Sequence, residues 1–134
     1  MPSNYQSYTK IPLSAGANGV GILVNAIGPA GTLGDVIHVA VPGTVSVDEI
    51  VLYASCQSTL STTPVLLTLQ WGGIDIVGVV YPDEIKYQIQ KGKGLQLICD
   101  HQVINNGLVI AAYVDAASAN LCLIHGYVNR IAKV

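Results

Sequence analysis

Apolar and polar residues alternate with a period of two through most of this chain, and helical spacing is almost absent. The stretch from Leu67 to Trp71 alternates strictly, which is the pattern of a half-buried strand. Gly72-Gly73 follows it, and Gly-Gly reaches the positive φ angles of a tight turn without steric cost. The run from Ile74 to Val80 is then apolar at nearly every position. This pattern predicts a central β-hairpin that turns at Gly72-Gly73, with a returning strand covered on both faces.

The rest of the chain predicts further short strands separated by turns rich in Gly, Pro, Asn and Ser. The segment from Ser46 to Cys56 also fits helical spacing, with Ser46 and Glu49 as a capping box, but its β-branched and aromatic residues favour a strand. The closing strand is expected to be central, because residues of both parities in it are apolar. Besides the hairpin, strands are predicted at 5–13 (an edge strand or an arm on a neighbour), 20–27, 35–41, 46–56, 85–89, 95–100, 108–114 and 121–131.

Eight to ten short strands at spacings near ten residues predict an all-β fold, an antiparallel β-sandwich or jelly roll. The 134 residues form one domain (1–134) that is large enough to bury a core, with residues 1–19 as a possible N-terminal arm and loop. Five of the charged residues fall between Asp83 and Lys93, which predicts a solvated edge there.

Composition points to a protein that is partly covered by a partner. Charged residues make up only 10% of the chain and the mean hydropathy is +0.51, yet no apolar run is long enough for a membrane span. Surplus apolar surface on a soluble domain usually forms a protein interface. We therefore expect an obligate oligomer or an assembly subunit, and no membrane partner.

Compartment and nucleic-acid binding are constrained by the same sequence. The N-terminal residues resemble neither a signal peptide nor a lipidation signal, so synthesis in a cytoplasm is expected. Cys56, Cys99 and Cys122 are odd in number and lack CxxC spacing, which predicts free buried thiols. A net charge of −2 with six basic residues argues against direct binding to nucleic acid.

Motifs for catalysis or cofactors are missing from the sequence. His38, His101 and His125 each stand alone, so hydrogen-bonded structural histidines are the expectation, and a three-histidine metal site assembled in space is the alternative. No Gly-x-Ser-x-Gly, dinucleotide or phosphate-binding motif occurs, and the adjacent Asp83 and Glu84 suit a turn better than a glycosidase pair. We predict a protein with no catalytic residues, cofactor or metal.

Aromatic residues gather near predicted strand ends and at the N-terminus. Trp71 and Tyr81 lie at opposite ends of the predicted hairpin arms, and Tyr5 and Tyr8 lie in the first predicted strand. Such side chains fill cores and interfaces, and they also stack on sugar rings. Packing in the core or an interface is the simpler interpretation, and a glycan-binding edge is the other.

Four segments carry a family resemblance: Val41-Pro-Gly-Thr44, Gln70-Trp-Gly-Gly73, Glu84-Ile-Lys-Tyr-Gln-Ile89 and His125-Gly-Tyr-Val-Asn-Arg-Ile131. Together they resemble small β-sandwich structural proteins of tailed-bacteriophage virions, in particular capsid decoration or cement proteins, and the resemblance covers most of the chain from Val39 onward.

The resemblance implies a non-enzymatic protein, often a homotrimer, that sits on the outer capsid surface and clamps the major capsid protein shell. It carries over no individual functional residue. The candidate interface residues are Tyr5, Tyr8, Trp71, Tyr81, Tyr127 and Arg130, and either the segment 5–13 or the loop 28–34 is expected to contact the shell.

Three alternatives remain open from the sequence. A tail, neck or head-fibre component of a phage virion would have the same composition. A carbohydrate-binding β-sandwich would use an exposed aromatic platform, and a small cupin-like enzyme would bind metal stoichiometrically.

Overall fold

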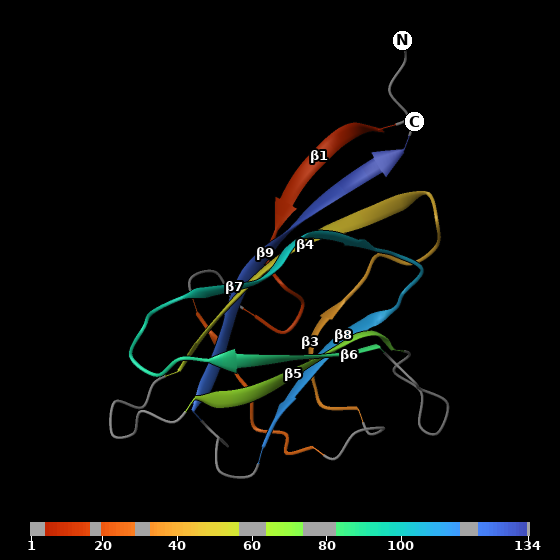
Figure 1. The fold of residues 1–134 in the computed structure, drawn as a ribbon. Helices are drawn as coiled ribbons and strands as arrows, with labels where there is room; N and C mark the ends of the chain where they lie inside the picture. The colour runs from red at the N-terminus through yellow and green to blue at the C-terminus, as the bar shows by residue number, and fades with distance from the viewer. Residues whose placement is uncertain are drawn as a thin grey trace.

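The chain folds into two antiparallel β-sheets that pack face to face (Figure 1). The structure is a computed structural model that describes residues 5–16, 20–28, 33–56, 64–73, 83–115 and 121–133. Within these ranges the regular structure consists of β-strands alone, so the predicted all-β sandwich is confirmed. In the described part of the chain, no helix has the length and apolar character to cross a membrane.

Nine strands within the described ranges build the two sheets. In sheet A, the order is β1-β9-β4-β7, and the short β2 pairs with β9 beside β1. In sheet B, the order is β3-β8-β5-β6. The strands are β1 (Tyr5–Ile11), β2 (Ile22–Leu23), β3 (Asp35–Val39), β4 (Ser46–Cys56), β5 (Val65–Gly73), β6 (Asp83–Ile89), β7 (Gln96–Ile104), β8 (Val109–Val114) and β9 (Cys122–Lys133).

The strand order is that of a jelly roll. From β3 to β9 the chain changes sheet at every connection except the one from β5 to β6, and β4 and β9 are neighbours in sheet A while β5 and β8 are neighbours in sheet B. A jelly roll has eight strands in two sheets connected as a double Greek key, and here β2 is an additional strand in sheet A. The predicted central position of the closing strand is confirmed, because β9 pairs with β4 from Cys122 to Ala132 and has β1 and β2 on its other side.

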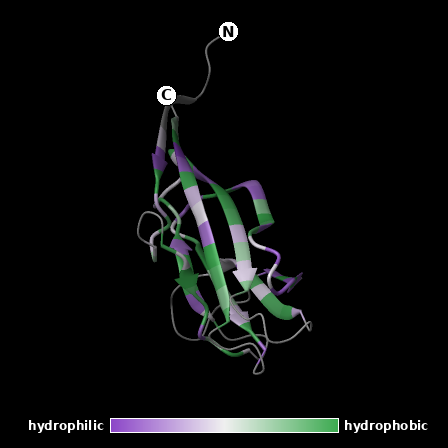
Figure 2. Ribbon diagram, turned by 90° about the vertical axis from the view of Figure 1, so that its left-hand side faces the viewer, coloured by the Kyte–Doolittle hydropathy of each residue, from purple (hydrophilic) through white to green (hydrophobic). Residues whose placement is uncertain are grey.

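The core lies between the sheets and follows the alternation of the strands. On β4, the residues at even positions from Ile50 to Cys56 are buried, and on β9 the same holds from Cys122 to Val128 apart from Gly126. Facing them from sheet B are Val65, Leu67 and Leu69 of β5. Figure 2 shows the hydrophobic residues along these strands in green.

Sheet A is longer than sheet B and projects beyond it. The C-terminal half of β9, paired with β1, and the start of β4 form this extension (Figure 1). At the point where sheet B ends, the inward positions of sheet A change from apolar to charged: Val128 is followed by Arg130 on β9, and Ile50 is preceded by Asp48 on β4.

The prediction of a tight turn at Gly72-Gly73 is wrong. β5 continues through Gly73, which pairs with Val109, and Gly72 occupies a bulge with a φ of +84°. The strand that pairs with β5 is β6, with Trp71 opposite Asp83. A bulge needs the positive φ of glycine as much as a turn does, so the dipeptide alone does not separate the two. The predicted returning run 74–80 lies outside the described residues.

Other strand predictions differ from the structure mainly in length. The segment 46–56 is a strand with the predicted bounds, so the helical alternative is excluded. The strand predicted at 20–27 is reduced to Ile22–Leu23 and an isolated bridge from Ile27 to Val114. β7 extends to Ile104, beyond the predicted end at 100, because a bulge at His101 lets the ladder continue. The charged segment 83–93 lies at the edge strand β6, as expected for a solvated edge.

Candidate functional site

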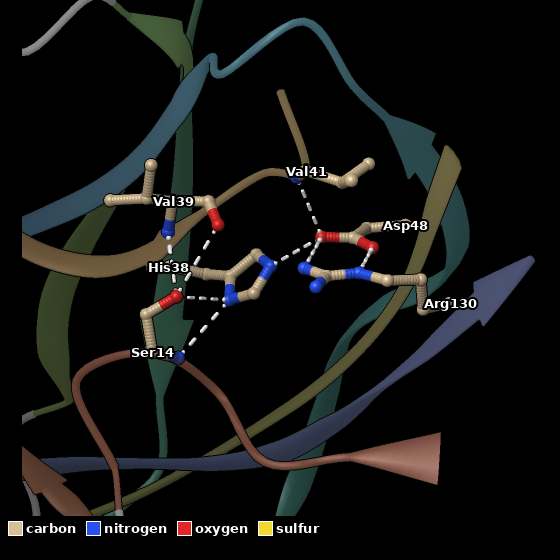
Figure 3. Close-up of polar contacts among 6 residues, drawn as sticks. All are labelled: Ser14, His38, Val39, Val41, Asp48 and Arg130. Atoms are coloured by element: carbon tan, nitrogen blue, oxygen red, sulfur yellow. Dashed lines mark hydrogen bonds and ion pairs between the residues drawn. The ribbon is translucent and has the colours of Figure 1, made fainter. Parts of the chain in front are cut away.

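A buried polar network joins the two sheets at the end of the sandwich where sheet A begins to project. Asp48 of β4 accepts hydrogen bonds from Arg130 of β9 through Nε (2.7 Å) and Nη2 (3.0 Å). Its Oδ2 atom also lies 2.8 Å from Nε2 of His38, on β3 of the opposite sheet (Figure 3). The side chains of His38 and Asp48 are 1% and 0% exposed. A buried hydrogen bond between His38 and Asp48 therefore connects the two sheets, and the ion pair of Asp48 with Arg130 lies within sheet A.

A bulge in β3 turns His38 into the interior. The register of β3 against β8 shifts between Val36 and His38, and as a result both Ile37 and His38 are buried. An unbroken alternation would have placed one of these two neighbours outside. The sequence pattern contains no signal for this bulge.

Ser14, in the loop after β1, caps the other side of the imidazole. Its backbone N–H donates to Nδ1 of His38 (3.1 Å), and its Oγ lies 2.8 Å from the same nitrogen. The Oγ atom also accepts from the N–H of Val39 (3.1 Å). Since a nitrogen that accepts from an amide carries no proton, the network assigns the neutral tautomer with the proton on Nε2, where it donates to Asp48 (Figure 3).

Burial and hydrogen bonding shift the pKa values in this network. Burial lowers the pKa of His38, and the hydrogen bond and negative charge of Asp48 offset this only in part. Burial alone would raise the pKa of Asp48, but hydrogen bonds from Arg130 and His38, together with the charge of Arg130, hold it below the ordinary value. The folded state thus favours a neutral His38 beside an ionised Asp48.

These shifts predict a fold that loses stability in acid. Because both pKa values are lower in the folded state, the unfolded chain binds more protons as the pH falls, first at His38 below 6.5 and then at Asp48 below 3.8. We expect the free energy of unfolding, measured in urea, to fall between about pH 7.5 and about pH 5, and less steeply in His38→Gln, whose amide does not titrate. An equal fall in the variant would contradict the assignment to His38.

The connectivity of Ser14, His38 and Asp48 matches that of a nucleophile, a base and an orienting carboxylate. Acyl transfer also needs free N–H donors for an oxyanion. Here the N–H of Ser14 is bound to His38, that of Ala15 to the carbonyl of Ile37 (3.2 Å) and that of Gly16 to the carbonyl of Leu13 (3.0 Å). We therefore interpret the network of Ser14, His38, Asp48 and Arg130 as a structural clasp. It joins the two sheets and holds the loop after β1 against β3.

The remaining nucleophiles and potential metal ligands of the described residues are dispersed. Cys56, Cys99 and Cys122 are free and buried, as predicted, and burial with the nearby Cys56 raises the pKa of Cys122 to about 12. His101 is exposed beside Asp100, and His125 packs against Gly21. Among the described residues, no three His, Cys, Asp or Glu side chains gather where they could hold a metal ion.

The structure distributes the predicted interface residues over different parts of the molecule. Tyr5 and Tyr8 lie on the edge strand β1, and Tyr127 lies on the neighbouring β9 with the ammonium of Lys10 4.2 Å from its ring centre. Arg130 points inward and is bound to Asp48. Trp71 lies in the other sheet, at the end of β5, and Tyr81 lies outside the described residues.

Trp71 lines a cleft of about 390 Å³ at the open side of the sandwich, between the edge strands β6 and β7. The hydroxyl of Tyr87 spans this cleft and donates to the carbonyl of Ile98 (2.7 Å). Apolar, acidic and amide side chains surround the space: Leu69, Ile85, Tyr87, Ile98, Asp83, Asp100 and Gln102. This lining suits a small ligand with both apolar and hydroxyl groups.

Comparison of the chain with protein-family models, curated proteins and solved structures found no match to any of them. The resemblance to virion decoration proteins therefore stays a prediction, and the function has to be argued from the geometry above.

Proposed function

We propose that this protein is a non-enzymatic assembly protein of a tailed-phage virion, a decoration or cement protein that binds and stabilises the major capsid protein shell. The observation that supports this most is that sheet A, whose inner face packs against sheet B, carries Leu97 and Val103 on its outer face, where they are 51% and 57% exposed. Such a sheet suits a subunit that is partly covered by neighbours.

The fold fits this role, and proteins with other roles share it. Jelly rolls serve in viral capsid proteins, in lectins and in cupins, so the fold supports the proposal only by analogy. The clasp of His38, Asp48 and Arg130 suits a load-bearing protein, because it ties the two sheets together where sheet A is least supported. A cement protein must transmit force between neighbours without its sheets separating.

Among the described strands β1 pairs with β9 alone, and its other edge offers the shell a place to bind. The carbonyl of Cys122 accepts a hydrogen bond from the N–H of Val24, on the side of β9 where β2 lies. Because alternate residues of a strand direct their N–H and C=O groups to the same side, the even-numbered residues of β9 direct theirs toward β1 and β2. Arg130 pairs with Thr9, and by the alternation of an antiparallel ladder the backbone N–H of Lys10 then points away from β9. A shell strand could add to this edge by main-chain hydrogen bonds.

The experiment is co-sedimentation of the purified protein with shells of the same virus that lack it. We expect saturable binding by the wild type. Lys10→Pro, which removes the edge N–H, should bind at least about tenfold more weakly than Lys10→Ala, which has lost the same charge but keeps the N–H. Absence of binding by the wild type would refute the proposed function, and equal binding by the two variants would refute the β1 edge as the contact.

A carbohydrate-binding module is the second candidate, and the cleft at Trp71 favours it. Sugar rings stack on aromatic faces while their hydroxyls bond to carboxylates and amides, and this cleft combines Trp71 with Asp83, Asp100 and Gln102. Under this alternative, a glycan array would show binding that Trp71→Ala abolishes.

A further inference from the structure

Two of the three cysteines face each other across the pairing of β4 with β9. Cys56, the last residue of β4, is the Cα partner of Cys122, the first residue of β9. Residues that lie directly opposite in an antiparallel pair have their side chains on the same face. Here that face is the inner one, because both residues belong to the hydrophobic core, with exposed fractions of 8% and 0%. The two free thiols are therefore neighbours in the core.

Cys56 and Cys122 form a non-hydrogen-bonded pair of the ladder. The carbonyl of Cys122 accepts a hydrogen bond from the N–H of Val24, on the β2 side of β9, so the backbone groups of Cys122 point away from β4. The Cα atoms of such a pair are about 4.5 Å apart. A disulfide requires a Cα separation of about 4.4–6.8 Å. The backbones of β4 and β9 thus already have the separation that a bond between these two cysteines needs.

Cys99 lies at a different level of sheet A. It is the Cα partner of Leu52 on β4, four residues before Cys56, which corresponds to about 13 Å along a strand. Its Sγ atom donates to the carbonyl of Ile50 over 3.4 Å. A disulfide with either of the other cysteines would require Cα atoms within about 7 Å. The strand register therefore selects one of the three possible cysteine pairs.

We propose that Cys56 and Cys122 are a site of oxidative modification, where a cross-strand disulfide forms when the folded protein meets a small oxidant such as hydrogen peroxide. The sulfur of Cys56, the more exposed of the two, attacks the peroxide as a thiolate. An S–O bond forms, the O–O bond breaks, and the hydroxide that leaves takes up the thiol proton to become water.

The sulfur of Cys122 then attacks the sulfur of Cys56 in the second step. The S–S bond forms, the S–O bond breaks, and the departing hydroxide takes up the proton of the Cys122 thiol to become a second water. In total, the two thiols lose two electrons and two protons, and the peroxide is reduced to two molecules of water.

The disulfide would tie the end of the β4–β9 pairing that lies farther from the clasp. This pairing runs from Ser46 opposite Ala132 to Cys56 opposite Cys122, and Asp48 of the clasp lies near its other end. The bond closes residues 56–122 into a long loop, which constrains the unfolded chain. Thiols stay reduced in a cytoplasm, and disulfides persist in oxidising surroundings. A cement protein would thus become more stable outside the host cell, but the inference itself does not depend on shell binding.

The test is to locate the disulfide by mass spectrometry. Reduced, folded protein is treated with hydrogen peroxide at about pH 8.5, where thiolates are available, and the remaining thiols are alkylated. Digestion before aspartate, without reducing agent, then places the three cysteines in separate peptides, 48–74, 83–99 and 115–134. We expect 48–74 linked to 115–134, at least about tenfold more abundant than any linked pair that contains 83–99.

A second sample removes burial as an obstacle to the oxidant. The chain is unfolded in urea and refolded in a mixture of reduced and oxidised glutathione, which should give the same linked pair. Oxidation should also raise the urea concentration at the unfolding midpoint, and a reducing agent should reverse this rise. Cys99→Ala is the matched control and should cross-link like the wild type, whereas Cys56→Ala and Cys122→Ala should not respond to oxidation.

Three results would overturn the inference: free thiols at Cys56 and Cys122 in both samples, a main product that contains peptide 83–99, or a disulfide between two chains. Shell co-sedimentation separates this inference from the proposed function. A wild type that forms the disulfide without binding shells refutes the function alone, and one that binds shells without forming it refutes the disulfide alone.

Discussion

Replacing Asp48 by alanine should lower the free energy of unfolding by about 3 kcal/mol, because it leaves the guanidinium of Arg130 and the Nε2–H of His38 without their acceptor. The N–H of Val41, which donates to Asp48 over 3.0 Å, loses its acceptor as well. Arg130 is 37% exposed and can partly turn to water, so the expected loss lies at the low end for a broken buried ion pair. Urea unfolding at neutral pH measures it.

The matched control is Asp83→Ala, at an exposed position of the edge strand β6, where the expected loss is below about 0.5 kcal/mol. Arg130→Met should cost less than Asp48→Ala, since Asp48 then keeps its hydrogen bonds from His38 and Val41. Equal stability of Asp48→Ala and Asp83→Ala would show that the clasp does not hold the sheets together.

The second large effect is expected at Gly126, in the centre of β9. A Cβ atom there would lie 2.1 Å from the carbonyl oxygen of Val51 and 3.0 Å from the side chain of Leu52. Both belong to β4, the neighbouring strand in the middle of sheet A, so the two strands would have to move apart. We expect Gly126→Ala to lower the free energy of unfolding by about 1–3 kcal/mol, measured by urea unfolding.

Gly16→Ala is the control for this change. Its added methyl group would meet Ile22 at 3.5 Å, an ordinary contact distance, and it should be neutral or slightly stabilising because alanine restricts the unfolded chain. If both substitutions had the same effect, close packing of β9 against β4 could not be the reason for glycine at 126.

The alternation of residues predicted the strands well, because burial of one face imposes a period of two on every strand. It predicted β4 as a strand despite a plausible capping box, since Ile50–Tyr53 suits a pleated sheet. It could not predict the bulges at Ile37, Gly72, Ile98 and His101, where one extra residue shifts the register. Register depends on contacts between distant strands, and local sequence does not contain it.

The clasp was missed for the same reason, although one half of it left a signal. Asp48 shares the parity of Ile50, Leu52 and Ala54, so a charged residue at an inward position of β4 could have been inferred from the sequence. Its partners could not, because Arg130 is 82 positions away along the chain and His38 is buried only through the bulge. Arg130 was predicted as an interface residue, and the structure places it in the clasp.

The measurement that tests the central claim most directly is the rupture temperature of shells with and without bound protein. A ligand that binds only the intact shell stabilises it by mass action. We therefore expect a rupture temperature that rises with added protein and reaches a plateau at saturation, and a smaller rise with Lys10→Pro than with Lys10→Ala at the same subsaturating concentration. A rupture temperature that stays constant while the wild type is bound would contradict a cement role.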